Sequence, residues 1–220
     1  MDITVSEELR RACPGFLGAA VYAEIRNSGC CEALWEEIDV FCRDYCARYT
    51  PESLKDMPSI QATRQAYKNC GKDPSRYRPS GEALVRRVLK GHELYRVNTV
   101  VDVINLASIA YGYSIGGFDF DKIKGDRLVL GVGKPGEPYE GIGRGPLNIE
   151  GLPVYRDTEG GIGTPTSDHE RTKLTVSSAR LLTIINGYDG NRQQVEACAG
   201  FLVERLKRYA GMQNETVFFF

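Results

Sequence analysis

A stretch dense in glycine and proline, residues 131–165, places the strongest constraint on how this chain folds. It contains ten glycines and five prolines, and short apolar pieces such as LVLGV (128–132) and LPVYRD (152–157) border or interrupt it. Glycine allows the positive φ of tight turns, whereas proline lacks the N–H group that an inner strand needs. The stretch therefore predicts short antiparallel strands joined by tight turns.

Helical periodicity is typical of much of the remaining chain. Apolar and aromatic residues share one stripe from Cys30 to Tyr49, which predicts an amphipathic helix. Ser80 is a suitable N-cap for a helix at 81–90, and Gly91 is a suitable stop. Further helices are expected at 59–69, 98–112 and 191–210.

Buried strands are expected where apolar runs lack this period. They include 16–25 and 181–187, with 2–6 as a partner of 16–25. A Gly-Gly turn at 116–117 is expected to lead from the helix at 98–112 into the strand FDFDKIKG, and the terminal TVFFF is apolar enough that it should dock. Together these elements predict one α+β domain over residues 1–220, with a layered antiparallel or mixed β-sheet core and packed helices.

Composition narrows the classes of function. The chain has 28 basic and 29 acidic residues and a net charge of -1, so no global positive field attracts DNA or a membrane, and any RNA contact must be a local patch. The start MDITVSEELRR has no signal-peptide core, and no apolar run approaches the ~18 residues of a membrane helix. A cytoplasmic protein is expected. Seven cysteines without CxxC spacing favour reduced, mostly buried thiols.

Two motifs resemble cofactor or metal sites, and each has a simpler interpretation. GVGKPG (131–136) has the letters of a dinucleotide-binding loop, but prolines and glycines follow it instead of the required helix, so a hairpin is favoured. Cys42 and Cys46 lie four apart on a helix without a second pair of ligands, which favours buried thiols over a metal site. We therefore expect no cofactor and no metal.

Ionisable residues suited to catalysis gather in SDHERT (167–172). His169 beside carboxylates can act as a general base, and Glu170 can orient a water molecule for hydrolysis. A solvated turn leading into the next segment is the alternative interpretation.

Arginines suited to anion binding lie in RYRPSGEALVRRVLKG (76–91). Arg86 and Arg87 can hold a phosphate or carboxylate because guanidinium matches the geometry of both. Pairing of these arginines with acids such as Glu82 is the alternative.

The helix at 98–112 carries a polar row beside a broad apolar face. Asn98, Asp102 and Asn105 follow one another at spacings of four and three, so their side chains share one edge of the helix. Such a row suits recognition of an amino acid or a sugar hydroxyl. It also suits fastening of a neighbouring turn by hydrogen bonds.

The stretch VVDVINLASIAYGYSIGGFDFDKIKGD carries a family likeness. It resembles the segment of the bacterial phenylalanyl-tRNA synthetase β subunit that reads approximately VVDxTNYVxxExGQPxHAFDxDKIxG, in the B3/4 editing domain. The likeness is strongest over residues 58–187, between an N-terminal part at 1–57 and a C-terminal helix and tail at 191–220. The matching residues, in one ungapped register, are Val100, Val101, Asp102, Asn105, Gly112, Phe118, Asp119, Asp121, Lys122, Ile123 and Gly125.

The resemblance implies a stand-alone domain of the B3/4 fold that hydrolyses a mischarged aminoacyl-tRNA or a related aminoacyl ester. Its small-molecule pocket is then expected among the helix and turn at 98–121, the helix of Arg86 and SDHERT, and Glu170 or His169 would orient the water. The residues expected to contact the substrate are Arg86, Arg87, Asn98, Asp102, Asn105, Gly116 and Asp119.

The chain departs from the family pattern at two pocket positions. Gly116 replaces the histidine of HAFD, and Ile104 replaces the threonine before the helical asparagine. The acid that completes the family's pocket has its nearest counterpart in Asp168 or Glu170. These departures motivate a second hypothesis, a non-catalytic module that binds an RNA end or an amino-acid-like molecule. A third is an interaction domain that uses TVFFF as an added strand.

Overall fold

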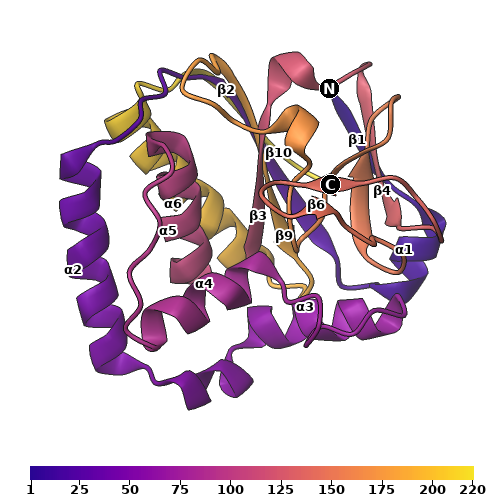
Figure 1. Cartoon of the computed structure of the whole chain (residues 1–220), viewed down its shortest axis with the longest axis horizontal. Helices are drawn as coiled ribbons and strands as arrows, with labels where there is room; N and C mark the ends of the chain where they lie inside the picture. The colour runs from indigo at the N-terminus through magenta and orange to yellow at the C-terminus, as the bar shows by residue number, and fades with distance from the viewer.

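Two four-stranded sheets stack in the middle of the molecule, and most helices cover one of them. The computed structural model describes residues 1–220. Figure 1 shows α5 and α6 beside the sheet that contains β2, β3 and β9, α2 outside them, and the sheet that contains β1 and β4 on the other side. This arrangement confirms the predicted α+β class with layered sheets and packed helices.

The first sheet has the order β10-β2-β9-β3, and all its pairings are antiparallel. The second has the order β1-β4-β7-β8, in which β1 runs parallel to β4 and the other pairs are antiparallel. The strands are β1 (Asp2–Val5), β2 (Leu17–Glu24), β3 (Ser114–Asp119), β4 (Arg127–Val132), β7 (Pro153–Arg156), β8 (Gly161–Gly163), β9 (Arg180–Gly187) and β10 (Gln213–Phe219), with a small hairpin of β5 (Glu140–Gly141) and β6 (Gly145–Pro146).

Five of the six α-helices lie where the sequence predicted them, and the short helix Glu7–Ala12 was not predicted. Ser80 was predicted as an N-cap but is the first residue of its helix, and Pro79 occupies the cap position without a side-chain hydrogen bond. The α-helices are α1 (Glu7–Ala12), α2 (Glu32–Arg48), α3 (Pro58–Asn69), α4 (Ser80–Leu89), α5 (Thr99–Tyr111) and α6 (Arg192–Ala210), and the 3-10 turns are η1 (Pro51–Asp56), η2 (Phe120–Lys122) and η3 (Glu170–Thr172). None of the helices combines the length and the hydrophobicity that a membrane span requires.

Two apolar clusters hold these layers together. The larger one fills the space between the first sheet and the helices α2, α5 and α6, with Val103, Ile185 and Leu202 among its fully buried members. The second lies between the two sheets and joins Leu130 of β4 to Leu182 of β9. Burial of the apolar surface in these two clusters is the main stabilising contribution to the fold.

One predicted strand pairing is wrong. The segment 2–6 was expected to pair with 16–25, but β1 pairs with β4, in the register Asp2 opposite Arg127. Both edges of β2 are already hydrogen-bonded, one to β9 and the other to the C-terminal β10. The prediction that the apolar C-terminal segment docks is confirmed, because β10 completes the edge of its own sheet.

The predicted Gly-Gly turn is also wrong. Gly116 and Gly117 lie within β3, opposite Ile184 and Thr183 of β9. The turn after α5 is made by Gly112, whose φ of 72° closes the helix in the left-handed conformation. A Cβ atom on Gly117 would lie 2.6 Å from Ile104 Cδ1, so glycine is needed for close packing of β3 on α5.

Candidate functional site

A cavity of about 330 Å³ opens between α4, α5, β3 and the loop that contains Asp168. Its walls are more apolar than polar, and the polar groups come from several separate segments. The apolar lining is Leu84, Val97, Val101, Ile104, Ile115, Ile142 and Leu174, and the polar lining is Ser80, Asn105, Ser108, Thr164, Ser167, Asp168 and Lys173, with Gly117 in the wall. This combination of apolar walls and a few convergent polar groups is typical of a small-molecule site.

Asp168 is the acid of this cavity. Its Oδ2 accepts a hydrogen bond of 3.0 Å from the backbone N–H of Gly117. A Cβ atom added to Gly116 would lie 3.2 Å from Asp168 Oδ1, and one added to Gly163 would lie 3.0 Å from it. The carboxyl group therefore occupies a slot that exists because both neighbouring residues are glycines.

Burial in this slot raises the pKa of Asp168 to about 7, and the Gly117 N–H only partly opposes the rise. A carboxyl group that titrates near neutral pH can exchange a proton with a bound substrate or water.

The loop before Asp168 is held by a local hydrogen-bond network. Thr164 Oγ1 accepts the backbone N–H groups of Thr166 and Ser167 at 3.2 and 3.1 Å. The hydroxyl of Thr166 hydrogen-bonds with the Tyr67 hydroxyl at 2.8 Å and donates to the carbonyl of Tyr77. These contacts tie the loop to α3, so the Asp168 carboxyl is presented by a rigid support.

Of the predicted polar row on α5, Asn105 lines the cavity, while the other two members fasten the start of the helix. Asn98 is buried and accepts the Val101 N–H at 3.0 Å as an N-cap. Asp102 accepts hydrogen bonds from Trp35 Nε1 at 2.9 Å and from the Val97 N–H at 3.1 Å. Burial raises the pKa of Asp102, partly offset by these donors.

Asp119 and Gly116 lie in β3 but are not among the residues that line the cavity. Asp119 is buried and accepts a hydrogen bond of 2.8 Å from the Ser178 hydroxyl. It also pairs with Lys122 at 3.3 Å. A Cβ on Gly116 would meet the Phe118 ring at 2.7 Å, so this position has no room for a side chain directed at the ligand.

The arginines of α4 have partners within the protein. Arg86 Nε donates to Glu82 at 2.8 Å, and the buried Glu82 also pairs with Arg64 at 2.9 Å. Arg87 donates to the carbonyl of Glu93, and its guanidinium lies 4.0 Å from the centroid of the Tyr95 ring. On this helix the cavity is lined by Ser80 and Leu84 instead.

His169 is the N-cap of η3 and Glu170 is its first residue, and neither lines the cavity. His169 Nδ1 accepts the Arg171 N–H at 2.9 Å, and its ring packs on Tyr139 in a separate shallow hollow. Burial and then the charge of Arg171 lower the pKa of His169. Glu170 forms an ion pair with Lys173, whose side chain does line the cavity.

Sequence reasoning missed Ser108, Thr164 and Lys173 as cavity residues. Ser108 was detectable in principle, because it follows Asn105 by three positions on the same helix face. Thr164 and Lys173 lie in irregular segments, for which no periodicity indicates a direction.

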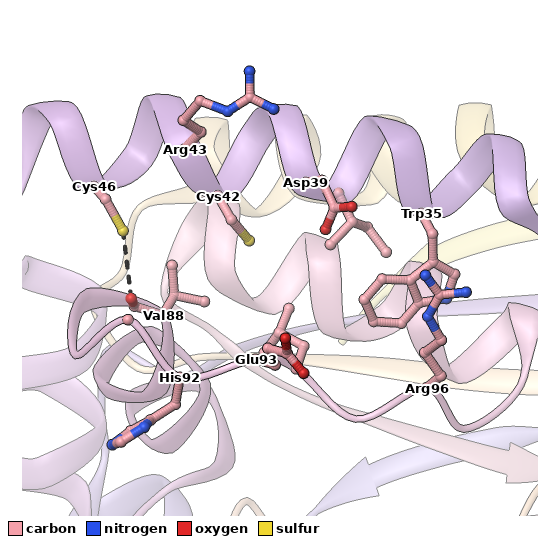
Figure 2. Close-up of a pocket in the computed structure, with 12 residues that line it drawn as sticks. Trp35, Asp39, Cys42, Arg43, Cys46, Val88, His92, Glu93 and Arg96 are labelled. Atoms are coloured by element: carbon pink, nitrogen blue, oxygen red, sulfur yellow. Dashed lines mark hydrogen bonds between the residues drawn. The ribbon is translucent and has the colours of Figure 1, made fainter.

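A second cavity of about 370 Å³ lies between α2 and residues 91–96 and is drawn in Figure 2. Figure 2 shows the side chains of Cys42 and Cys46 on the same side of α2, with Cys46 Sγ donating to the carbonyl of Val88 at 3.3 Å. At the other end, Arg96 lies 4.7 Å from the Trp35 ring. The prediction that the thiols are mostly buried is wrong. All seven cysteines are free, but only Cys13 and Cys198 are buried; Cys31, Cys42 and Cys70 are half-buried, and Cys30 and Cys46 are exposed.

Comparison with known proteins gives one family match and one structural likeness. The family model of the B3/4 domain matches residues 62–206. No curated protein matches the chain. Among solved structures, the chain is similar to an N-terminal fragment of the phenylalanyl-tRNA synthetase β subunit from Pyrococcus horikoshii, with 15% identity and a TM-score of 0.49 over 98% of this chain. The match covers 50% of that fragment, so the chain spans about half of its length.

Proposed function

The chain belongs to the B3/4 domain family, and from that membership we propose that its cavity binds the aminoacyl group of an ester and hydrolyses it. The proposed substrate is a mischarged aminoacyl-tRNA or a related aminoacyl ester. One observation carries the proposal. Asp168 stands in the wall of a cavity that is otherwise largely apolar, and burial raises the pKa of its carboxyl group to about 7.

Ester hydrolysis needs a base for the attacking water, donors for the developing oxyanion and space for the acyl side chain. In the proposed reaction the Asp168 carboxylate removes a proton from water as the water oxygen bonds to the ester carbonyl carbon. The tetrahedral intermediate then breaks its bond to the alkoxide oxygen of the leaving alcohol. Asp168 returns the proton to that oxygen, so the products are a free amino acid and a free hydroxyl group.

The remaining lining supplies the other requirements. The aliphatic wall around Ile104 and Leu174 takes an apolar or aromatic amino-acid side chain, and the volume of about 330 Å³ suits a ligand of that size. Asn105 and Ser108 offer hydrogen-bond donors to the carbonyl oxygen. Lys173 adds a positive charge, and its ion pair with Glu170 holds it in place.

The roles predicted for Glu170 and His169 therefore change in this proposal. Glu170 becomes a positioning residue for Lys173, and His169 has no direct role because it borders a separate hollow. The catalytic roles that the sequence predicted for Glu170 and His169 remain predictions, and the hydrolysis assay described below tests them.

The second candidate is binding of an amino-acid-like molecule without catalysis. The apolar Ile104 in the wall and the absence of room for a side chain at Gly116 favour it, because both reduce the number of polar groups around the ligand. In that case Asp168 would accept a hydrogen bond from the ammonium group of the ligand.

The test is release of free amino acid from a panel of mischarged tRNAs and small aminoacyl esters. We expect turnover by the wild-type protein and a loss of at least about 100-fold in Asp168→Asn, the usual cost of removing a general base. Glu170→Gln is the matched control and should lose less. If no ester is hydrolysed, the catalytic proposal fails, and saturable binding of a free amino acid would then support the second candidate.

A further inference from the structure

Basic residues gather on α3, on α4 and on the loop between these helices. Residues 64–86 contain six basic and two acidic residues, although the whole chain has a net charge of -1, so the rest of the chain is net negative. Five of the six basic side chains are exposed or half-buried and form what we call the basic patch. Its members are Arg64, Lys68, Arg76, Arg78 and Arg86.

Three guanidinium groups of the basic patch converge on one buried carboxylate. Glu82 is only 1% exposed, and its oxygens lie 2.9 Å from Arg64 Nη1 and 2.8 Å from Arg86 Nε. Arg78 Nε lies 3.6 Å from the same carboxylate. One carboxylate balances one of the three positive charges, so the cluster keeps an excess of positive charge. Guanidinium groups held in this way favour binding of a phosphate, whose oxygens match their planar donors.

Several donors of the basic patch have no partner within the protein. Arg86 hydrogen-bonds to Glu82 through Nε alone, and the side chain of Arg78 makes no hydrogen bond. These two side chains are 36% and 45% exposed. Arg76 is exposed and belongs to no ion pair. Glu82 therefore fixes Arg78 and Arg86 in place while their terminal nitrogens stay available to an anion.

An aromatic ring lies between two further cations beside this cluster. Lys72 Nζ is 3.8 Å from the centroid of the Tyr77 ring, and the guanidinium carbon of Arg76 is 5.7 Å from it. Lys72 Nζ donates to two backbone carbonyl groups at 2.9 and 2.6 Å, so no carboxylate neutralises its charge. Arg64 Nη2 donates to Ser75 Oγ at 3.1 Å, which ties this loop to α3. Cations combined with an aromatic ring are typical of surfaces that bind nucleic acid.

Direct hydrogen bonds connect the basic patch to the wall of the cavity. The carbonyl of Tyr77 accepts the Thr166 hydroxyl at 2.9 Å, and the N–H of Ser80 donates to the carbonyl of Pro165 at 2.7 Å. Pro165 and Thr166 belong to the loop that carries Asp168, and Ser80 itself lines the cavity. The segment that bears the patch thus adjoins the cavity.

We propose that the basic patch binds the phosphate backbone of the tRNA acceptor arm, whose esterified 3′ end enters the cavity. The inference rests on the proposed hydrolysis of aminoacyl-tRNA and assigns a surface to the nucleic-acid part of that substrate. Contacts of basic side chains with phosphates position a nucleic acid without reading its sequence. A local patch of this kind allows a chain with almost no net charge to hold a polyanion.

The first experiment measures the affinity for uncharged tRNA over a range of salt concentrations. The test variant combines Arg76→Gln and Arg78→Gln, two exposed positions. We expect its Kd to rise about tenfold at about 100 mM salt, and the slope of log Kd against log salt to fall by about one to two, because two phosphate contacts are lost. The matched control combines Arg43→Gln and Arg48→Gln.

The control removes the same charge from a different face. Arg43 and Arg48 are exposed residues of α2 without ion pairs, and Figure 1 shows α2 on the other flank of the molecule from the end of α3 that contacts α1. Its Kd should stay within about twofold of the wild-type value. An equal loss in both variants, or no loss in Arg76→Gln with Arg78→Gln, would overturn the proposal.

Two further measurements test the charge and the class of partner. The charge-retaining pair Arg76→Lys and Arg78→Lys should recover most of the affinity and the salt dependence, and thermal unfolding should show that all three variants are folded. A polyglutamate chain of comparable charge should bind much more weakly than tRNA. Binding of polyglutamate as tight as that of tRNA would point to an acidic protein partner and contradict an RNA surface.

Hydrolysis assays separate this inference from the proposed function. A small aminoacyl ester does not reach the basic patch, so Arg76→Gln with Arg78→Gln should keep the wild-type kcat/KM for it while the KM for mischarged tRNA rises. If no ester is hydrolysed but tRNA binding depends on both arginines, the hydrolysis proposal fails and the RNA surface stands. If mischarged tRNA is hydrolysed with an unchanged KM, the RNA surface is wrong and the assignment of the cavity stands.

Discussion

The Asp168 carboxylate accepts the backbone N–H of Gly117 at 3.0 Å, across 51 residues of sequence. This contact joins the loop after β8 to the middle of β3, and it holds an acid with a raised pKa in the wall of the cavity. A Cβ atom on Gly116 or Gly163 would crowd the other carboxyl oxygen, so the glycines of both segments make this approach feasible.

The rate of ester hydrolysis should depend on the ionisation of Asp168. Because its pKa is raised to about 7, we expect kcat/KM to increase with pH and to reach half of its plateau near pH 7. The residual rate of Asp168→Asn should lack this inflection. The measurement is kcat/KM against pH for one small aminoacyl ester, after subtraction of its spontaneous hydrolysis. An inflection that persists in Asp168→Asn would assign the base elsewhere.

The free energy of unfolding should decrease as pH rises, because Asp168 ionises at a lower pH in the unfolded chain than in the folded protein. The pKa of Asp168 rises from its ordinary 3.8 in the unfolded chain to about 7 in the folded protein, so between these values the unfolded state releases a proton that the folded state retains. The contribution of Asp168 to the free energy of unfolding is complete below about pH 4. It is lost as pH rises through 7, and the loss amounts to at most about 4 kcal/mol.

Urea unfolding of the wild type and of Asp168→Asn at pH 4 to 8 provides the measurement. The variant cannot ionise at this position, so its stability relative to the wild type should increase as pH rises. Parallel curves for the two proteins would show that Asp168 titrates in the folded state as it does in the unfolded chain.

Gly116→Ala should destabilise the fold, whereas Gly200→Ala should stabilise it. The new Cβ at position 116 would lie 2.7 Å from the Phe118 ring in the core, an overpacking that costs about 1–3 kcal/mol. Gly200 is exposed in α6 and a Cβ there meets nothing within 4 Å, so alanine should add about 0.5–1 kcal/mol of helix stability. Chemical denaturation measures both. Equal changes in stability at the two positions would contradict the conclusion that Gly116 is too closely packed to accept a Cβ atom.

Glu82→Ala should cost far more stability than Arg86→Ala. Glu82 is almost completely buried and receives hydrogen bonds from Arg64 and Arg86, so its loss should cost about 2–3 kcal/mol. Arg86 is one of several partners and is partly exposed, so its removal should cost less than about 1 kcal/mol. Thermal unfolding of the two variants tests this order. If Arg86→Ala also leaves KM unchanged, its guanidinium has a structural role in α4.

Much of the fold was predictable because its signals are local. The stripe that predicts α2, the stop signal after α4 and the apolar run of α5 all act within one helix, and these three helices appear where expected. The glycines and prolines at 131–165 likewise act through their own backbone, and the segment forms short strands and turns. The family likeness rests on residues in one continuous register, so it too could be read without the tertiary structure.

The candidate site was predictable only in part, because the direction in which a side chain points depends on tertiary packing. Asn98, Asp102 and Asn105 share one edge of α5, yet Asn98 and Asp102 use their oxygens to fasten the helix start and only Asn105 lines the cavity. In SDHERT, Asp168 lines the cavity while the next residue, His169, borders another hollow. No periodicity in the sequence indicates which of these side chains lines the cavity.

Residue spacing along this chain was thus sufficient for the α+β class, for most element boundaries and for the resemblance to the B3/4 domain. Tertiary packing decided that β1 joins β4, that Gly116 and Gly117 belong to a strand, and that Asp168 is the acid in the cavity. The physical reason is that helix and turn preferences arise between near neighbours. A partner strand, a buried slot and a raised pKa arise from segments that meet only when the sheets close around the core.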